Sequence, residues 1–230
     1  MTIIYSSKPL KERVSHDFYP TPIEICRASI IEYTRGILNT NTTKLVLDPG
    51  AGDGVWGKAF TKYHNKLFGY KYEITGVELR DCSQPTYRDQ WYNKVPYYDC
   101  WYNNTDFLTW ESEKKFDIIL GNPPYKYAEK FLFKCFDLLA PGGTLFFLLR
   151  LSFLESKRRY KLLYSKCPPV YVSVSTRRIS FTGNQKSDNT AYAIYYWEKG
   201  YDGQLWNVGD STLKWLDWDY DDLTDSENVV

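Results

Sequence analysis

The chain of 230 residues carries 29 Lys and Arg, 28 Asp and Glu and 2 His, for a formal net charge of +1. This total excludes a simple histone-like polycation, but it does not exclude nucleic-acid binding, because a sum says nothing about the distribution of charge. A hydrophobic fraction of 43% argues against disorder over most of the length.

The charge is distributed very unevenly along the chain. Residues 201–230 hold Lys214 against eight acidic residues. Residues 150–186 hold a single acid, Glu155, and nine basic residues, which we call the basic segment: Arg150, Lys157, Arg158, Arg159, Lys161, Lys166, Arg177, Arg178 and Lys186. The near-neutral total is therefore a balanced body, one basic segment and one acidic tail.

Other features of composition concern compartment and metal content. Five scattered cysteines form no CxxC pair, and two histidines have no zinc-ligand spacing, so we expect reduced thiols and no metal. No apolar run reaches the roughly 20 residues that span a bilayer. We therefore predict a cytoplasmic protein with no membrane partner.

Hydrophobic periodicity and turn residues predict alternating strands and helices. The predicted helices cover 22–36, 55–66, 131–140 and 155–166. A strand end is expected within 103–108, and six further predicted strands cover 44–48, 74–79, 116–120, 144–149, 170–175 and 190–197. The stretch 82–101 is not assigned.

This pattern predicts an α/β fold: a Rossmann-like, mostly parallel seven-stranded sheet with an antiparallel edge strand and helices on both faces. We expect an irregular segment at 1–18, one catalytic domain at 19–200 and an acidic tail at 201–230, in which Trp215 and Trp218 anchor a short helix. Ligands of such sheets bind at the carboxyl ends of the strands.

A glycine-rich loop follows the first predicted strand and opens a helix: Asp48-Pro49-Gly50-Ala51-Gly52-Asp53-Gly54. Its glycines let a ligand approach the backbone closely, next to the free N–H groups of a helix start. It lacks the Gly-Lys-Ser/Thr of a phosphate loop, and its acids suit an amino group or the sulfonium of S-adenosylmethionine better than a phosphate. The alternative is a plain helix cap.

Acidic residues also end the next two strands. Glu78 stands where a carboxylate accepts hydrogen bonds from both ribose hydroxyls of a nucleotide. Asp106 is placed to accept a hydrogen bond from an adenine amino group, and Phe107 is placed to pack on the adenine ring. Taken alone, an aspartate at this position is more often a turn residue.

The tetrapeptide Asn122-Pro123-Pro124-Tyr125 follows the apolar strand 116–120. The prolines fix the backbone and leave rigid outward carbonyls. The side-chain oxygen of Asn122 and the Pro123 carbonyl can both accept from one NH₂ group, which directs the nitrogen lone pair toward a methyl donor, while Tyr125 stacks on the planar group. The alternative is a proline-rich loop.

These motifs resemble class I S-adenosylmethionine-dependent methyltransferases, in particular the amino-methylating enzymes with an Asn-Pro-Pro-Tyr motif. The motif order is similar to that of gamma-type, phage-like DNA adenine-N6 methyltransferases, and the resemblance covers residues 17–197. It implies S-adenosylmethionine as cofactor, DNA as substrate, and the host-cell cytoplasm as location if a phage encodes the chain.

The resemblance assigns roles to two further segments. Tyr19, Pro20 and Thr21 precede the first helix, and similar segments fold over the methionine part of the cofactor; a capped helix start is the alternative. Phe181 is placed like the aromatic residue that stacks on a flipped adenine opposite Tyr125; a lid or core residue is the alternative.

The basic segment is expected to bind the nucleic-acid substrate. Its expected contacts with the nucleic-acid backbone are Lys157, Arg158, Lys161, Arg177, Arg178 and Lys186, and a solvated face is the alternative. We expect no separate target-recognition domain after residue 200, so specificity is expected from short loops (82–101 and 182–189) or from a partner. The remaining alternatives are an RNA amino-methyltransferase, a protein glutamine-N5 methyltransferase and a non-catalytic cofactor-binding subunit.

Overall fold

A computed structural model describes residues 20–34, 42–64, 71–88, 91–181, 190–206 and 210–218. The helical elements are α1 (Ile23–Thr34), α2 (Val55–Ala59), η2 (Phe60–His64), η3 (Tyr125–Tyr127), α4 (Ala128–Leu138), η4 (Leu151–Leu154), α5 (Lys157–Arg159) and η5 (Tyr160–Tyr164). The strands are β1 (Lys44–Pro49), β2 (Tyr72–Val77), β3 (Thr86–Arg88), β4 (Lys94–Pro96), β5 (Cys100–Tyr102), β6 (Phe116–Gly121), β7 (Leu139–Arg150), β8 (Tyr171–Ser175), β9 (Tyr192–Lys199), β10 (Leu205–Trp206) and β11 (Thr212–Leu216). None of the helices in these ranges is long and apolar enough to cross a membrane.

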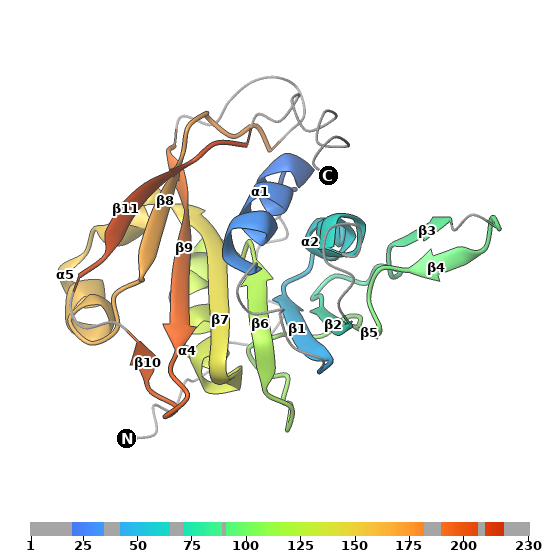
Figure 1. Cartoon of the computed structure of the whole chain (residues 1–230), viewed down its shortest axis with the longest axis horizontal. Coiled ribbons are helices and arrows are strands. Elements are labelled where there is room, and N and C mark those ends of the chain that lie inside the picture. The colour runs from blue at the N-terminus through green and yellow to red at the C-terminus, as the bar shows by residue number, and fades with distance from the viewer. Residues whose placement is uncertain are drawn as a thin grey trace, which may run out of the picture.

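The main sheet has the order β11-β8-β9-β7-β6-β1-β2-β5, with β10 paired to β9 (Figure 1). Strands β5, β2, β1, β6 and β7 run parallel to one another, and β9 runs antiparallel to both of its neighbours. The predicted α/β class is confirmed. The described strands of this sheet number nine where seven were expected, and the antiparallel strand is internal where an edge position was expected.

The additional edge strand comes from the segment predicted as a tail. Residues 212–216 form β11 and pair in parallel with β8, where a short helix was expected. The burial pattern explains this, because Trp215 is 68% exposed and the adjacent Leu216 is buried, which is the alternation of a strand. Trp218 then donates its indole N–H to Ser175 Oγ at 2.7 Å. Residues 219–230 lie outside the described ranges.

Two hydrophobic cores, one on each face, hold the sheet between helices. On one face, α1 and α2 pack their apolar residues on β1, β6 and β7 (in front of the sheet in Figure 1). On the other face, α4 packs Phe131, Leu132 and Cys135 against the side chains that the same strands direct to that face. The central strands are therefore buried on both faces, as their continuous apolar sequences require.

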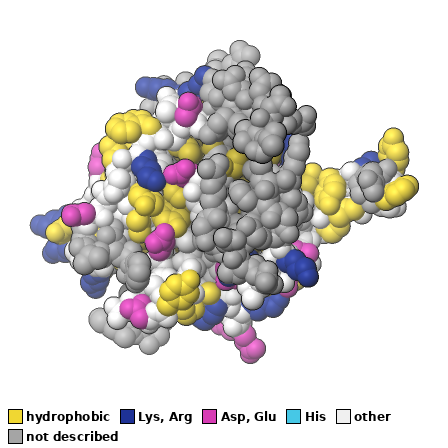
Figure 2. Space-filling view, in the orientation of Figure 1, with side chains coloured by type: hydrophobic (Ala, Val, Ile, Leu, Met, Phe, Trp, Pro, Cys, Tyr) yellow, Lys and Arg dark blue, Asp and Glu magenta, His cyan; other side chains and the backbone are white. Residues whose placement is uncertain are grey.

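The unassigned stretch 82–101 contains a hairpin and a strand. β3 and β4 pair with each other, and β5 joins the edge of the main sheet beside β2. The hairpin projects from the body (Figure 1), and its end carries Trp91 and Tyr92, which are 73% and 78% exposed. Hydrophobic side chains gather on this projection in Figure 2. The alternation of apolar and polar residues is too short here for sequence reasoning to assign the strands.

Two of the predicted helices differ from simple α-helices. The helix after the glycine loop continues from α2 into the π-helical turn η2, and the basic helix consists of α5 and the π-helical turn η5. The carboxyl ends of the parallel strands lead into the glycine loop, Glu78, residues 103–107, the Asn-Pro-Pro-Tyr tetrapeptide and η4. These segments therefore meet at one edge of the sheet, as expected for this topology.

Candidate functional site

The glycine loop turns sharply between β1 and α2. Gly50, Gly52 and Gly54 have positive φ angles of 76°, 61° and 73°, a region that only glycine adopts readily. The backbone N–H groups of Gly50 and Ala51 donate to the Val77 carbonyl at 2.8 and 3.0 Å. The loop is thus folded against the end of β2, and a Cβ atom on Gly50 would lie 3.4 Å from the ring of Phe131.

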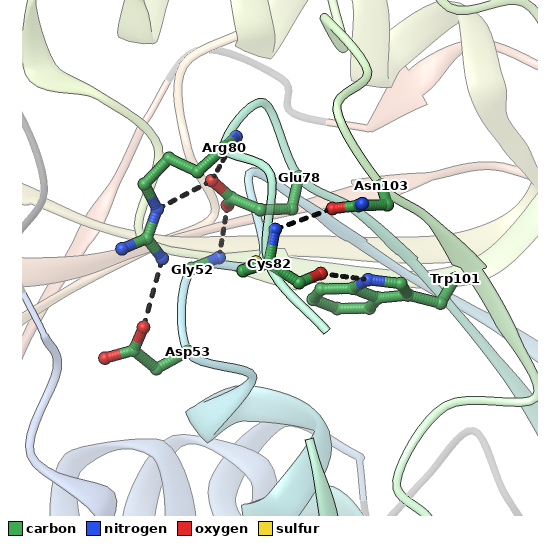
Figure 3. A network of polar contacts seen from close by, with 7 residues as sticks. All are labelled: Gly52, Asp53, Glu78, Arg80, Cys82, Trp101 and Asn103. Atoms are coloured by element: carbon green, nitrogen blue, oxygen red, sulfur yellow. Dashed lines mark hydrogen bonds and ion pairs between the residues drawn. The ribbon is translucent and has the colours of Figure 1, made fainter. Parts of the chain in front are cut away.

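Glu78 fixes this loop through a network of polar contacts (Figure 3). Its Oε2 accepts the Gly52 N–H at 2.6 Å, while its Oε1 accepts the backbone N–H and Nε–H of Arg80 at 2.9 and 2.8 Å. Arg80 also reaches Asp53 Oδ1 with Nη2 at 3.1 Å. The network surrounds a carboxylate that is only 5% exposed, and it aligns the loop with the end of β2. Arg80 was not predicted as a site residue, because its only signal in the sequence is its position two residues after the acid.

Asp48 lies beneath the loop and does not line the pocket described below. It is completely buried, and its Oδ2 accepts a hydrogen bond from the Tyr98 hydroxyl at 2.7 Å. The same hydroxyl accepts the Gly57 N–H at 3.1 Å, so Tyr98 ties β1 to α2. Burial raises the pKa of Asp48 to about 7, although the hydrogen bond from Tyr98 favours the ionised form.

We expect this raised pKa to make stability depend on pH. Asp48 has an ordinary pKa of 3.8 in the unfolded chain and about 7 in the fold, so the native state keeps a proton that the unfolded state has released. The stability that protonated Asp48 contributes is fully present below pH 3.8 and is lost as pH rises through 7. At about 1.4 kcal/mol per pKa unit, the free energy of unfolding falls by roughly 4 kcal/mol. Urea unfolding at a series of pH values measures it.

The matched control for this pH dependence is Asp48→Asn, which keeps an acceptor for Tyr98 and does not titrate. Its free energy of unfolding should stay nearly level across the interval in which the wild-type value falls. Parallel profiles for the two proteins would show that Asp48 is not the group responsible.

Asp106 and Phe107 close the pocket on the side of β5. The Thr105 N–H donates to the Glu78 carbonyl at 2.8 Å, which places the two predicted acids side by side. Asp106 Oδ1 accepts the Leu108 N–H at 3.0 Å, so part of its acceptor capacity shapes a turn. The ring of Phe107 packs on Phe131 with 4.9 Å between centroids.

The Asn-Pro-Pro-Tyr tetrapeptide lies at the end of β6 and faces the residues before α1. Asn122 donates from Nδ2 to Thr21 Oγ1 at 3.1 Å, a contact between positions 101 residues apart. This bond orients the amide so that its carbonyl oxygen points away from Thr21. Pro123 is buried, while Pro124 lines the pocket.

Tyr125 lies among aromatic and cationic groups. Its ring centroid is 5.7 Å from that of Tyr192, and the Arg150 guanidinium lies 4.9 Å from it. Burial raises the pKa of Tyr125, so the phenol is neutral at physiological pH. Phe181 is 6% exposed and meets Tyr192 edge to face at 5.0 Å. In this structure Phe181 is therefore a core residue, and Tyr192 contacts both rings that were expected to enclose a base.

One pocket unites most of the predicted cofactor residues. It is lined by Pro20, Thr21, Gly50, Gly52, Asp53, Glu78, Asp106, Phe107, Asn122 and Pro124. Asp48, Pro49 and Pro123 do not line it, Tyr125 lines a neighbouring pocket, and Tyr19 lies outside the described residues. Further lining residues were not predicted from the sequence, among them Trp56, Arg80, Lys126, Tyr127 and Phe131. The combination of carboxylate acceptors, open glycine backbone and aromatic walls fits an adenosine-containing cation.

The predicted backbone contacts are spread over two surfaces. Lys157 and Lys161 are exposed on α5 and η5, where Lys and Arg side chains gather in Figure 2, and Arg158 pairs with Glu129 at 2.9 Å. Arg177 and Arg178 are exposed after β8, and Lys186 lies outside the described residues. Arg158 is therefore partly neutralised by an acid on α4.

Known proteins resemble this chain in sequence and in fold. Type II methyltransferase M.CvrRI of Paramecium bursaria Chlorella virus XZ-6E is 31% identical over 50% of this chain and 26% of its own length. Type II methyltransferase M.TthHB8I of Thermus thermophilus is 33% identical over 42% of this chain and 19% of its own length. The chain thus spans about a quarter or less of these relatives. No model of a protein family matches it.

A solved structure of a candidate class I S-adenosylmethionine-dependent methyltransferase from Listeria monocytogenes covers 89% of this chain and 68% of its own, with a TM-score of 0.61 and 14% identity. The chain therefore has the class I S-adenosylmethionine-dependent methyltransferase fold, and the predicted resemblance to that class is confirmed. S-adenosylmethionine, the predicted cofactor, is the cofactor of this class.

Proposed function

We propose that the chain transfers a methyl group from S-adenosylmethionine to the exocyclic N6 amino group of adenine in DNA. The observation that carries this proposal is the position of Asn122: it follows β6 directly and lines the same pocket as the glycine loop and Glu78. The similarity to two type II methyltransferases supports transfer of a methyl group. The amino-methylating motif supports an NH₂ acceptor.

The pocket residues have distinct proposed roles toward the cofactor, which supplies an electrophilic methyl group when bound. Glu78 has one oxygen, Oε2, with a single hydrogen bond from the loop, and this oxygen accepts from the ribose hydroxyls. Asp106 accepts from the adenine amino group, and Phe107 packs against the adenine ring. Pro20 and Thr21 contact the methionine part, and Asp53, the acid of the loop that lines the pocket, favours its cationic groups.

Asn122 and Pro123 act on the amino group that receives the methyl group. The Asn122 side-chain oxygen and the Pro123 carbonyl accept its two hydrogens, which reduces conjugation of the nitrogen lone pair with the ring and directs it toward the methyl donor. The bond from Asn122 Nδ2 to Thr21 sets the orientation of this acceptor before the substrate arrives. Catalysis then relies on preorganised acceptors.

An adenine inside a duplex reaches Asn122 and Pro123 only when the base is flipped out of the base stack. We propose that Tyr125 stacks on the flipped base and that Phe181 leaves its core position beside Tyr192 to cover the other face. Stacking is worth about 1–3 kcal/mol per base and offsets part of the cost of flipping. The exposed basic residues of the basic segment contact the DNA backbone, and a partner or the β3–β4 hairpin supplies sequence specificity. We place this reaction in the cytoplasm of the cell that holds the DNA.

The test is transfer of tritiated methyl groups to three acceptors: duplex DNA, structured RNA and a protein extract. We expect label in DNA and a background level in the other two. Label in RNA alone or protein alone would replace the DNA assignment, and absence of label from all three would contradict an active methyltransferase.

A further inference from the structure

A second pocket lies beside Tyr125, next to the cofactor pocket. It is lined by Tyr125, Lys126, Arg150, Ser152, Phe153 and Arg159, together with small and apolar residues. Lys126 lines both pockets, so the two adjoin. This pocket is formed where the end of β7 turns into η4 and faces the start of α4.

The lining of this second pocket is strongly cationic. It contains two arginines and one lysine, and no Asp or Glu is among its lining residues in the described part of the chain. Arg159 donates to the backbone carbonyls of Phe153 and Ser152 at 2.7 and 3.2 Å, and also to that of Glu155. Because these acceptors are neutral, they fix the guanidinium without cancelling its charge. The neighbouring Arg158 differs, since it is paired with a carboxylate.

The cations are also held in place by the surrounding structure. The Arg159 guanidinium lies 4.7 Å from the ring centroid of Phe153, and the Arg150 guanidinium lies 4.9 Å from that of Tyr125. The backbone of Arg150 is fixed at the end of β7, where its carbonyl accepts from the Tyr195 hydroxyl at 3.1 Å. A partly open cavity with fixed guanidinium groups is suited to bind a phosphate, which Arg recognises through paired hydrogen bonds.

We propose that this pocket binds a phosphodiester of the DNA strand directly flanking the flipped nucleotide. The proposal rests on the proposed function, in which Tyr125 stacks on the target base. Arg150 contacts Tyr125 and lines the pocket, so a base on Tyr125 brings its own backbone phosphates to Arg150. Phosphate contacts position a nucleotide without reading its sequence. The pocket therefore holds the strand in the flipped geometry.

The test replaces one phosphate at a time by a neutral methylphosphonate in a DNA duplex that holds a methylation site. We expect one of the two phosphates flanking the target to matter most, with kcat/KM lowered about tenfold, the usual scale for a lost charge-assisted hydrogen bond. The variant Arg150→Met should be slower on unmodified DNA and should lose the added sensitivity to that methylphosphonate. Arg150→Lys, which keeps the charge, should retain part of the sensitivity to that methylphosphonate.

The matched control is Lys115→Met, which removes a charge at the start of β6, the end of the strand opposite Asn122. It should show the wild-type pattern of sensitivity. Equal sensitivity in Arg150→Met and wild type, or no sensitive phosphate beside the target in wild type, would overturn the pocket while leaving methyl transfer to DNA intact. Absence of transfer to any DNA would overturn the proposed function and the pocket with it. The wild-type scan decides the question even if Arg150→Met does not fold.

Discussion

Asn122→Ala is expected to lower kcat for methyl transfer by at least about 100- to 1,000-fold, the range found when one preorganised group that stabilises a transition state is removed. The variant loses the oxygen that accepts one hydrogen of the amino group, as well as the contact with Thr21. The hydrogen bonds that tie the glycine loop to Glu78 and to the end of β2 do not involve this side chain. Single-turnover transfer and titration calorimetry separate the two properties.

The affinity for S-adenosylmethionine should stay within a few-fold in Asn122→Ala, so that the loss lies in the chemical step. Asn122→Asp is the matched variant, because a carboxylate keeps acceptor oxygens and can accept from the Thr21 hydroxyl. It should recover part of the rate. Full activity of Asn122→Ala would remove Asn122 from the proposed mechanism, and equal loss of cofactor affinity and rate would make its role one of binding.

Glu78→Gln is expected to weaken binding of S-adenosylmethionine by about 10- to 100-fold. The carboxylate ties Gly52 to the end of β2 and pairs with Arg80, and the proposed ribose contacts are charge-assisted hydrogen bonds to the same group. Each such bond is worth about 1.5–3 kcal/mol, which corresponds to this range of affinity. Calorimetric titration with the cofactor measures the change directly and does not depend on catalysis.

The control for this prediction lies on β2, the strand that Glu78 follows. Glu73→Gln removes a carboxylate of β2 that pairs with Lys114 and does not line the pocket, so the affinity should stay at the wild-type value. Circular dichroism shows whether both variants keep their fold. If Glu78→Gln bound the cofactor as tightly as Glu73→Gln, the site would have been assigned to the wrong residues.

The parts of the fold that depend on local pattern could be predicted from the sequence. The strands β1, β2, β6 and β7 were expected from apolar runs bounded by turn residues, and the loop 48–54 from its glycines. Because parallel strands bring their carboxyl ends to one edge, Glu78, Asp106 and Asn122 were expected to lie together, and the structure places all three around one pocket.

The parts that depend on distant partners could not be predicted. Tyr98 reaches Asp48 across 50 positions, and Thr21 reaches Asn122 across 101, and no local pattern encodes either contact. Trp215 and Trp218 are three residues apart, which suggested a helix, but pairing with β8 makes the segment a strand. Phe181 was expected near the base because its segment resembles the loop that places an aromatic ring on a flipped adenine, whereas packing on Tyr192 places it in the core. In each case a tertiary contact outweighs the local signal.

The central claim is methylation of adenine N6 in DNA at the Asn122 site, and mass spectrometry of the nucleosides from digested product DNA tests it most directly. DNA treated with the wild-type chain and S-adenosylmethionine should yield N6-methyldeoxyadenosine, and DNA treated with Asn122→Ala should yield none above background. A methyl group found on cytosine or on a ring nitrogen, or the same yield of N6-methyldeoxyadenosine from both proteins, would contradict the account.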